Sequence, residues 1–357
     1  MDSLTQGLLG GVAAQALCGR RLPKTAWLIG TAAGLAADLD LFIRPNSDPL
    51  GGLTYHRHFT HALAFIPLGG LLAALPFLPF RAFAGRRWAV VAAALVAYAT
   101  HGLLDACTSY GTLLYWPFSD ARVAWDFIGI IDPVYTLILL VGLVWAVRVR
   151  KARVAAAAWL LSTLYIGLGA VQHHRAAAVQ RQLAAARGQR IERGRALPTL
   201  GNLILWRSIY EADGCLHADA VCVPFFAAPT VHRGTLTPRL TLAVLEANGP
   251  WAPGARRAFE RFAWFADDYT AYDANDPRAV GDMRYATRPD VFASLWGLHL
   301  PGPEPGGAPR FVQLPGSRGD GLRYVWEAVR GRSPLFQPID AAIRREAQPP
   351  RTQLDDP

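Results

Sequence analysis

Residues 88–107 read WAVVAAALVAYATHGLLDAC, an apolar run of 20 residues that ends with His101 and Asp105. About 20 mostly apolar residues are enough for a helix to cross the hydrocarbon core of a bilayer. His101 and Asp105 are four residues apart, so a helix presents both side chains on one face. Because ionisable side chains are costly in or beside hydrocarbon, this pair predicts a functional site at the end of a membrane span.

The rest of the first half of the chain has the same apolar character. The sequence has 357 residues, of which 52% are hydrophobic and only 18% are charged. The opening stretch Leu4–Cys18 is shorter and rich in Gly and Ala, which favours either a tilted first span or a re-entrant helix packed against its neighbours. We expect an all-α polytopic membrane domain of about five to six helices over residues 1–174. Its other predicted spans are Thr25–Ile43, Ala62–Phe80, Pro133–Val149 and Val154–Val171.

Basic residues give this domain an orientation. A net charge of +9 is compatible with nucleic acid or with an anionic membrane surface. Much of it is Arg at the ends of apolar runs, which favours the membrane, so no nucleic-acid partner is expected. Only Arg44, Arg57 and Arg122 fall in the short loops of one side, and the positive-inside rule places the other side in the cytoplasm. The basic residues of that other side are Arg20, Arg21, Lys24, Arg81, Arg86, Arg87, Arg148, Arg150, Lys151 and Arg153.

Two further clusters of ionisable residues lie beside other apolar runs. One is Asp38-Leu39-Asp40, and the other is HRHFTH at residues 56–61, in which Thr60 is a plausible N-cap for the following span. A single Asp or His at a span end is ordinarily a solvated interfacial residue. Here all three clusters fall on one predicted side of the membrane, which predicts a polynuclear metal site. The expected ligands are Asp38, His56, His61, His101 and Asp105, with His58 as a further candidate ranked below His56 and His61.

The ligand types also restrict the metal and the supporting roles. Carboxylates together with imidazoles suit zinc, manganese or iron(II) better than calcium. Asp38 and Asp40 would not share a helix face, so one is expected to ligate and the other to support or bridge. Asp40 or Asp132 is expected to act as general base or supporting residue, although Asp132 is also a candidate helix cap before Pro133. Arg57 is expected to hold an anionic substrate group or a ligand carboxylate.

The second half of the chain differs in composition. Residues 175–197 predict a juxtamembrane helix or linker, residues 198–347 a soluble β-rich domain, and residues 348–357 a disordered tail. Short aromatic runs separated by Gly, Pro and Asp are typical of β-strands. The expected strands are Asn202–Tyr210, Phe259–Phe265, Asp282–Tyr285 and Arg323–Val329.

Four cysteines divide between the two halves. Cys18 and Cys107 belong to apolar spans and are expected to be inert packing residues. Cys215 and Cys222 fall in the domain expected to be exported, where a disulfide is able to persist. Two free thiols are an equally good interpretation of these two residues.

The motifs together resemble the bacterial YdjM-like family of predicted inner-membrane metal-dependent hydrolases. The resemblance covers the membrane half, and the tail more loosely resembles the C-terminal extension of some longer members. The family is distantly similar to helical zinc-dependent phospholipases C and single-strand nucleases, which implies a phosphoester substrate by analogy of fold. The chain departs from the family at Gln6, where many relatives have His, and at His58, where they have a small residue. The matching stretches are residues 1–6 (MDSLTQ), 37–40 (ADLD), 56–61 (HRHFTH), 101–105 (HGLLD) and 131–133 (IDP).

These expectations favour a multi-pass protein of the bacterial inner membrane that hydrolyses a phosphoester or lipid-linked substrate. Water would be activated at more than one divalent ion, with zinc expected and manganese or iron as alternatives. The metal site, the C-terminal domain and contact with membrane lipids would be extracytoplasmic. A metal or proton transporter is a second hypothesis, although transport sites usually lie near the bilayer midplane. A non-catalytic scaffold stabilised by metal is a third.

Overall fold

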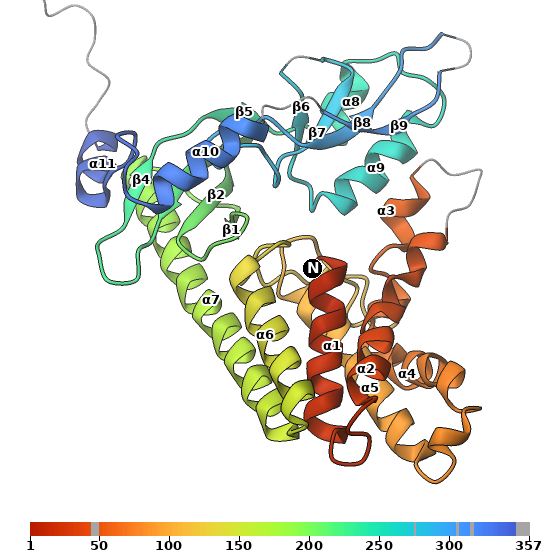
Figure 1. Ribbon diagram of the computed structural model, residues 1–357. Helices are drawn as coiled ribbons and strands as arrows, with labels where there is room; N and C mark the ends of the chain where they lie inside the picture. The colour runs from red at the N-terminus through yellow and green to blue at the C-terminus, as the bar shows by residue number, and fades with distance from the viewer. Residues whose placement is uncertain (44–49, 275, 305–306, 315–317, 348–357) are drawn as a thin grey trace, which may run out of the picture. The chain divides into compact units, whose positions relative to one another are not determined.

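The computed structural model describes residues 1–43, 50–274, 276–304, 307–314 and 318–347 (Figure 1). The predicted disordered tail, residues 348–357, and Arg44 lie outside the described residues. The chain divides into two compact units. A helical unit contains Met1–Val171 and Leu200–Asn202, and a β-rich unit contains Gln172–Thr199 and Leu203–Pro357.

The helical unit is built from seven α-helices joined by short 3₁₀ turns, counted over the described residues. The last of them, α7, begins here and continues into the β-rich unit. The helices are α1 (Ser3–Cys18), α2 (Ala26–Leu35), α3 (Gly51–Tyr55), α4 (Ile66–Ala74), α5 (Arg87–Ala106), α6 (Pro133–Val149) and α7 (Ala152–Ala186). The 3₁₀ turns that matter for the site are η1 (Ala36–Phe42), η2 (Phe59–His61) and η3 (Leu63–Phe65).

Small residues let α1 and α2 pack at close range. A Cβ atom added to Gly10 would lie 2.5 Å from the carbonyl oxygen of Gly30 and 2.9 Å from the Cα of Gly34. Buried alanines of α2 and α5 fill the adjoining core, including Ala33 and Ala93. The backbones of α1 and α2 therefore meet directly. α1 has 16 residues, which is shorter than a usual span.

The predicted number of spans is only partly supported. Among the described residues, α5 and α7 are the two helices long and apolar enough to cross a membrane. The segments Gly51–His61 and Leu63–Phe77, bent by 59°, would add a third if they form one broken span, and α6 is a shorter apolar helix. The predicted run Thr25–Ile43 is not one α-helix, because α2 ends at Leu35 and η1 continues with tighter turns. The count of five to six spans therefore remains a prediction.

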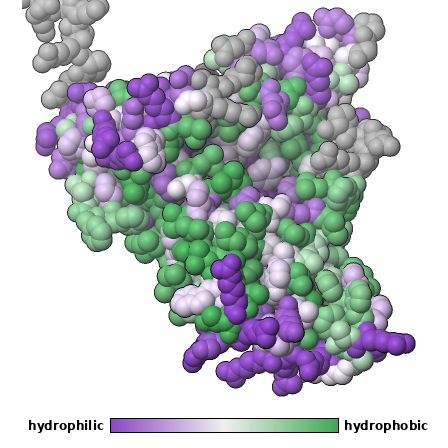
Figure 2. Space-filling model, in the orientation of Figure 1, coloured by the Kyte–Doolittle hydropathy of each residue, from purple (hydrophilic) through white to green (hydrophobic). Residues whose placement is uncertain are grey.

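One end of the helical unit is rich in arginine. The turns after α1, before α5 and after α6 lie at the same end (Figure 1), and hydrophilic side chains gather there below a hydrophobic band (Figure 2). Arg86 Nη1 donates to the carbonyl oxygen of Arg21 at 3.0 Å, and Arg21 stacks on Trp88. Since α5 starts at this end, its last residues lie about 27 Å away along the helix axis.

The β-rich unit contains two antiparallel sheets. The larger has the order β1-β2-β3-β4-β10 with β5 also paired to β3, and the smaller has the order β6-β7-β8-β9. The larger sheet contains β1 (Arg193–Pro198), β2 (Leu205–Ala212), β3 (Cys215–Cys222), β4 (Thr230–His232), β5 (Leu236–Pro238) and β10 (Gln337–Pro338). The smaller contains β6 (Thr270–Tyr272), β7 (Ala279–Asp282), β8 (Trp296–His299) and β9 (Arg310–Gln313). The helices of this unit are α8 (Leu242–Ala247), α9 (Ala255–Phe265), α10 (Arg318–Val329) and α11 (Ile339–Glu346).

Residues 175–197 begin as a helix that leads out of the last predicted span, because α7 continues unbroken to Ala186 before β1 follows. Two predicted strands of this half are wrong. The runs Phe259–Phe265 and Arg323–Val329, predicted as strands, lie in α9 and α10. In α9 the buried rings recur every three residues, at Phe259, Phe262 and Phe265, which is the spacing of a helix face.

Two other expectations for this half are now decided in part. The predicted strand Asn202–Tyr210 overlaps β2, and the predicted strand Asp282–Tyr285 meets β7 only at Asp282. Cys215 and Cys222 stand at opposite ends of β3, about 23 Å apart along an extended strand. They are therefore free thiols and do not form a disulfide.

Candidate metal centre

The end of α5 supplies two side chains to a buried cluster. His101 and Asp105 are both about 1% exposed, and His101 Nε2 lies 3.9 Å from Asp105 Oδ2. Gly102 stands between them and lets another segment approach, because a Cβ at this position would lie 2.1 Å from the carbonyl oxygen of His61. The short η2 turn that ends at His61 is thereby held directly against α5.

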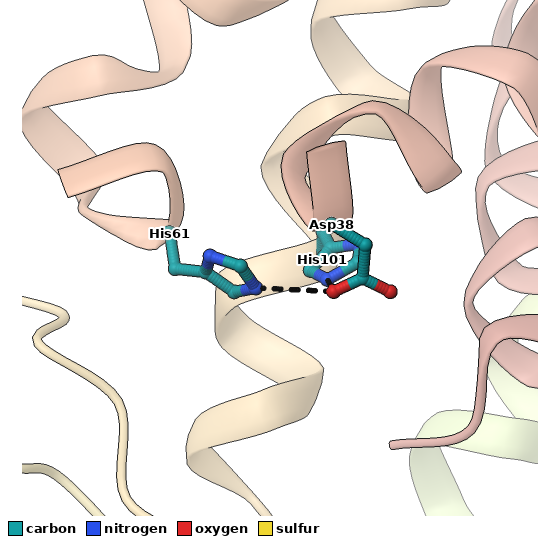
Figure 3. A group of neighbouring side chains, drawn as sticks. All are labelled: Asp38, His61 and His101. Atoms are coloured by element: carbon teal, nitrogen blue, oxygen red, sulfur yellow. Dashed lines mark ion pairs between the residues drawn. The ribbon is translucent and has the colours of Figure 1, made fainter. Parts of the chain in front are cut away.

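Asp38 joins the two histidines at a common point. Its Oδ1 atom lies 3.3 Å from His101 Nε2 and 3.6 Å from His61 Nε2 (Figure 3). The ligand atoms of these three residues all lie within 4.8 Å of one another. Both Nε2 atoms are buried and have no hydrogen-bond partner among the described residues. Buried polar atoms without partners are rare, so these two nitrogens mark a place where a cation fits.

The far nitrogen of each imidazole is held by the protein. His101 Nδ1 lies 2.5 Å from the carbonyl oxygen of Gly34, which makes Nδ1 the donor in this hydrogen bond. His61 Nδ1 lies 3.2 Å from Asp40 Oδ2 and 2.9 Å from Thr60 Oγ1. Carbonyl and carboxylate partners of this kind orient histidines that bind metals.

Asp40 organises the loop that carries the histidines. Its Oδ1 lies 3.0 Å from His56 Nδ1, while its Oδ2 accepts hydrogen bonds from the Arg57 backbone amide at 3.0 Å and from Thr60 Oγ1 at 2.8 Å. Asp38, Asp40 and His56 form a second group with ligand atoms within 4.8 Å, and this group shares Asp38 with the first. A carboxylate has about four acceptor sites, so Asp40 is largely occupied by its protein partners.

Asp105 is neutralised by its surroundings. Arg57 Nε lies 2.9 Å from Asp105 Oδ2, and Gln6 Nε2 donates to Asp105 Oδ1 at 2.9 Å. The amino group of Met1 also contacts Oδ1. Arg57 is itself buried, stacks on Tyr110 at 4.6 Å and does not face solvent. Arg57 thus forms an ion pair with Asp105, one of the carboxylates expected to bind metal, and its functional role stays a prediction.

This cluster lies within the part of the chain that has known relatives. Residues 1–176 match the YdjM inner membrane protein family. Over these residues the chain belongs to the YdjM family. No match was found among curated proteins or among solved structures. The YdjM region contains every residue of both candidate metal groups.

Two of the expected site residues lie elsewhere in the YdjM region. His58 Nδ1 accepts a hydrogen bond from the Phe59 amide at 2.7 Å, and its ring lies 5.7 Å from that of Trp116, so His58 belongs to neither metal group. Asp132 caps α6 by accepting from the Tyr135 amide at 3.0 Å, and Tyr165 donates to its Oδ2 at 2.9 Å. Burial raises the pKa of the Asp132 carboxyl. The capping role is therefore the one that the structure has.

Thr60 has a role different from the expected one. It lies inside η2 and donates to Asp40, whereas α4 begins only at Ile66, so Thr60 does not cap the following helix. Two supporting residues were not predicted. The backbone carbonyl of Gly34 holds His101, and the hydroxyl of Thr108 holds Arg57 Nη1 at 3.1 Å. Backbone carbonyls carry no residue signature, although Gly102 directly after His101 was a usable sign of close packing.

Proposed function

We propose that the YdjM region is a membrane-bound metal-dependent hydrolase whose substrate is a phosphoester or lipid-linked molecule. The observation that carries the proposal is the pair of buried Nε2 atoms of His61 and His101, which make no hydrogen bond to any described residue and both face Asp38 Oδ1. Two imidazoles and one carboxylate match the three protein ligands of catalytic zinc sites, and they also suit manganese and iron(II). Zinc is the metal that we favour.

We assign Asp38, His61 and His101 to hold the first ion. Asp105, whose Oδ2 lies 3.4 Å from His61 Nε2, is the fourth ligand that we assign. The group formed by Asp38, Asp40 and His56 would hold a second ion, with Asp38 shared between the two. A bound ion of this type supplies a Lewis acid that lowers the pKa of water and polarises a phosphoryl oxygen.

The other residues of the cluster position these ligands. Asp40 fixes the ring of His61 through Nδ1 and ties His56 to the same loop. Arg57 offsets the charge of Asp105 inside the protein, which favours the ionised carboxylate in a buried position. Asp38 is 17% exposed, whereas Asp40 and Asp105 are almost fully covered. We therefore propose that the substrate approaches from the solvent-exposed side of the Asp38 carboxylate.

The membrane setting suggests where the substrate comes from. The site lies at the end of α5 opposite the arginine-rich turns, and the positive-inside rule puts arginine-rich turns in the cytoplasm. We therefore propose that the site and the C-terminal unit are extracytoplasmic. A substrate anchored in lipid would then meet the site at the level of the headgroups, with membrane lipids as its surroundings.

The test is hydrolysis by the full chain purified in detergent and loaded separately with zinc, manganese and iron(II). The substrates are a soluble aryl phosphodiester, a phospholipid and a lipid-linked phosphoester. We expect turnover of at least one of them, reduced to background in His101→Ala and retained in His58→Ala, whose imidazole lies outside both metal groups. Activity that survives in His101→Ala contradicts the proposal, as does a metal-loaded wild type that hydrolyses no substrate in the panel.

One observation favours transport as a second candidate function. His61 lies at the break between the bent segments Gly51–His61 and Leu63–Phe77, and broken helices carry ion sites in many transporters. A transporter would move divalent cations across the bilayer of proteoliposomes without hydrolysing any substrate. Hydrolysis without cation flux would remove this candidate.

A further inference from the structure

The loop between β3 and β4 carries two exposed aromatic rings. It contains PFFAAP at residues 224–229, and Phe226 is fully exposed at 102% while Phe225 is 40% exposed. Residues 220–231 contain no Asp, Glu, Lys or Arg. A pair of exposed aromatic rings in a stretch without charged residues is unusual on a soluble surface and marks contact with an apolar partner.

The root of this loop is fixed to α7. Gln172 Nε2 donates to the carbonyl oxygens of Val223 at 2.7 Å and of Leu203 at 3.0 Å. One turn further along α7, Arg175 Nη2 lies 3.4 Å from the carbonyl oxygen of Ala227. Figure 1 shows the loop that enters β4 running alongside α7. Gln172 and Arg175 therefore fix the position of the loop along the axis of α7.

The sequence of α7 indicates which part of the helix would lie in the hydrocarbon core. Between Arg153 and Arg175, the residues Val154–His174 include no Asp, Glu, Lys or Arg. These 21 residues span about 31 Å as a helix, which equals the thickness of a bilayer hydrocarbon core of about 30 Å. Exposed leucines cover this part of the helix, including Leu160, Leu164 and Leu168. Arg175 then lies at the boundary between hydrocarbon and headgroups.

We infer that the loop of residues 224–229 inserts Phe225 and Phe226 into the headgroup boundary of the membrane beside α7. Arg175 fixes the loop at this boundary, the loop has no charge that would resist insertion, and its rings have apolar surface to bury. The partner is the lipid surface itself. The inference requires only that α7 crosses the bilayer, so it holds whether or not the metal site is catalytic.

The same sheet offers a matched control position. Leu236 on β5 is also exposed, at 60%, and pairs with His217, near the other end of β3. Along the strand it lies about 20 Å from the root of the loop at Val223. A fluorophore at Leu236 is therefore attached to the same sheet by the same chemistry, but lies away from the predicted lipid contact.

The experiment places an environment-sensitive fluorophore on Phe226→Cys or Leu236→Cys in the full chain. Both chains also carry Cys215→Ser, since Cys215 is the one native thiol that is not buried. They are reconstituted in phosphatidylcholine vesicles with and without lipids that carry a nitroxide near the headgroup. We expect blue-shifted emission and strong quenching at position 226, with water-like emission and little quenching at position 236.

Ala227→Cys, on the same exposed loop, is a second reporter that keeps both rings. Quenching at 226 and 227 above that at 236 supports the inference. Equal quenching at all three positions, or water-like emission at both loop positions, overturns it and leaves a protein partner as the explanation for the exposed rings.

Discussion

Asp40 Oδ2 lies 3.2 Å from His61 Nδ1, on the opposite side of the imidazole ring from the Nε2 atom that faces Asp38. The same carboxylate binds His56 Nδ1 through its other oxygen. One buried side chain thus sets the orientation of two histidines that come from a loop with little regular structure. We regard Asp40 as the residue that makes the candidate site rigid.

Replacing Asp40 with Asn tests this role. The variant keeps the size of the side chain but loses the charge that orients both imidazoles, so metal affinity should fall about 10- to 100-fold. The measurement is competition for zinc against a chelator of known affinity. Asp132→Asn is the matched control, because this cap lies outside both metal groups and Asn remains a good cap. Equal affinity in Asp40→Asn and wild type would show that Asp40 does not act on the site.

Gly102→Ala tests the close contact between α5 and η2. The added Cβ would lie 2.1 Å from the carbonyl oxygen of His61, so the two segments must move apart. We expect a loss of about 1–3 kcal/mol in unfolding free energy together with weaker zinc binding. Gly167→Ala in α7 is the control, because nothing lies within 4 Å of its added Cβ. Thermal unfolding in detergent distinguishes them, and an unchanged Gly102→Ala would contradict the packing described.

The sequence predicted the helices best where local signals agree with tertiary packing. α6 begins at Pro133 and ends at Val149 as expected, because a Pro at the first turn follows the Asp132 cap. The pairing of His101 with Asp105 followed from helix geometry alone. Convergence of Asp38, His61 and His101 was a hypothesis about three distant segments, and no local pattern fixes such a meeting.

Other features were not predictable for identifiable reasons. The short aromatic runs in α9 and α10 are compatible with either strand or helix, and burial on one face decides for helix. Asp38 and Asp40 have different partners because η1 is a 3₁₀ helix. No side-chain cap marks the start of η1, so the sequence does not predict it. Arg57 has positive φ and turns back onto Asp105, a conformation that its sequence neighbours do not suggest.

The β-rich unit should lose stability in acid. Burial would raise the pKa of Glu211, but hydrogen bonds from Arg193 and Arg239, each at 2.7 Å, outweigh it and hold the pKa below its ordinary value. A depressed carboxyl pKa contributes stability above the ordinary pKa, and this contribution is lost as the pH falls through the lower value in the folded protein.

Thermal unfolding of the full chain between pH 7 and pH 3 measures this loss. Wild type should lose more stability on acidification than Glu211→Gln, which cannot titrate at this position. Parallel pH profiles for the two chains would show that Glu211 contributes nothing to the acid response.

The orientation in the membrane is open to direct labelling. Gly85 lies in the arginine-rich turn before α5 with open space around it, and Leu236 lies exposed on β5. Both chains carry Cys215→Ser, since that native thiol is not buried. In intact cells, a maleimide that cannot cross the inner membrane should label Leu236→Cys and not Gly85→Cys. Permeabilised cells should label both. The reverse pattern in intact cells would invert the proposed topology.

The most direct test of the account is the metal content of the full chain purified in detergent, measured by elemental mass spectrometry. We expect at least one divalent transition-metal ion per chain in wild type and in His58→Ala, and loss of that ion in the double variant His61→Ala, His101→Ala. Wild type without stoichiometric metal, or a double variant that retains it, would contradict the assignment of Asp38, His61 and His101 as a metal site.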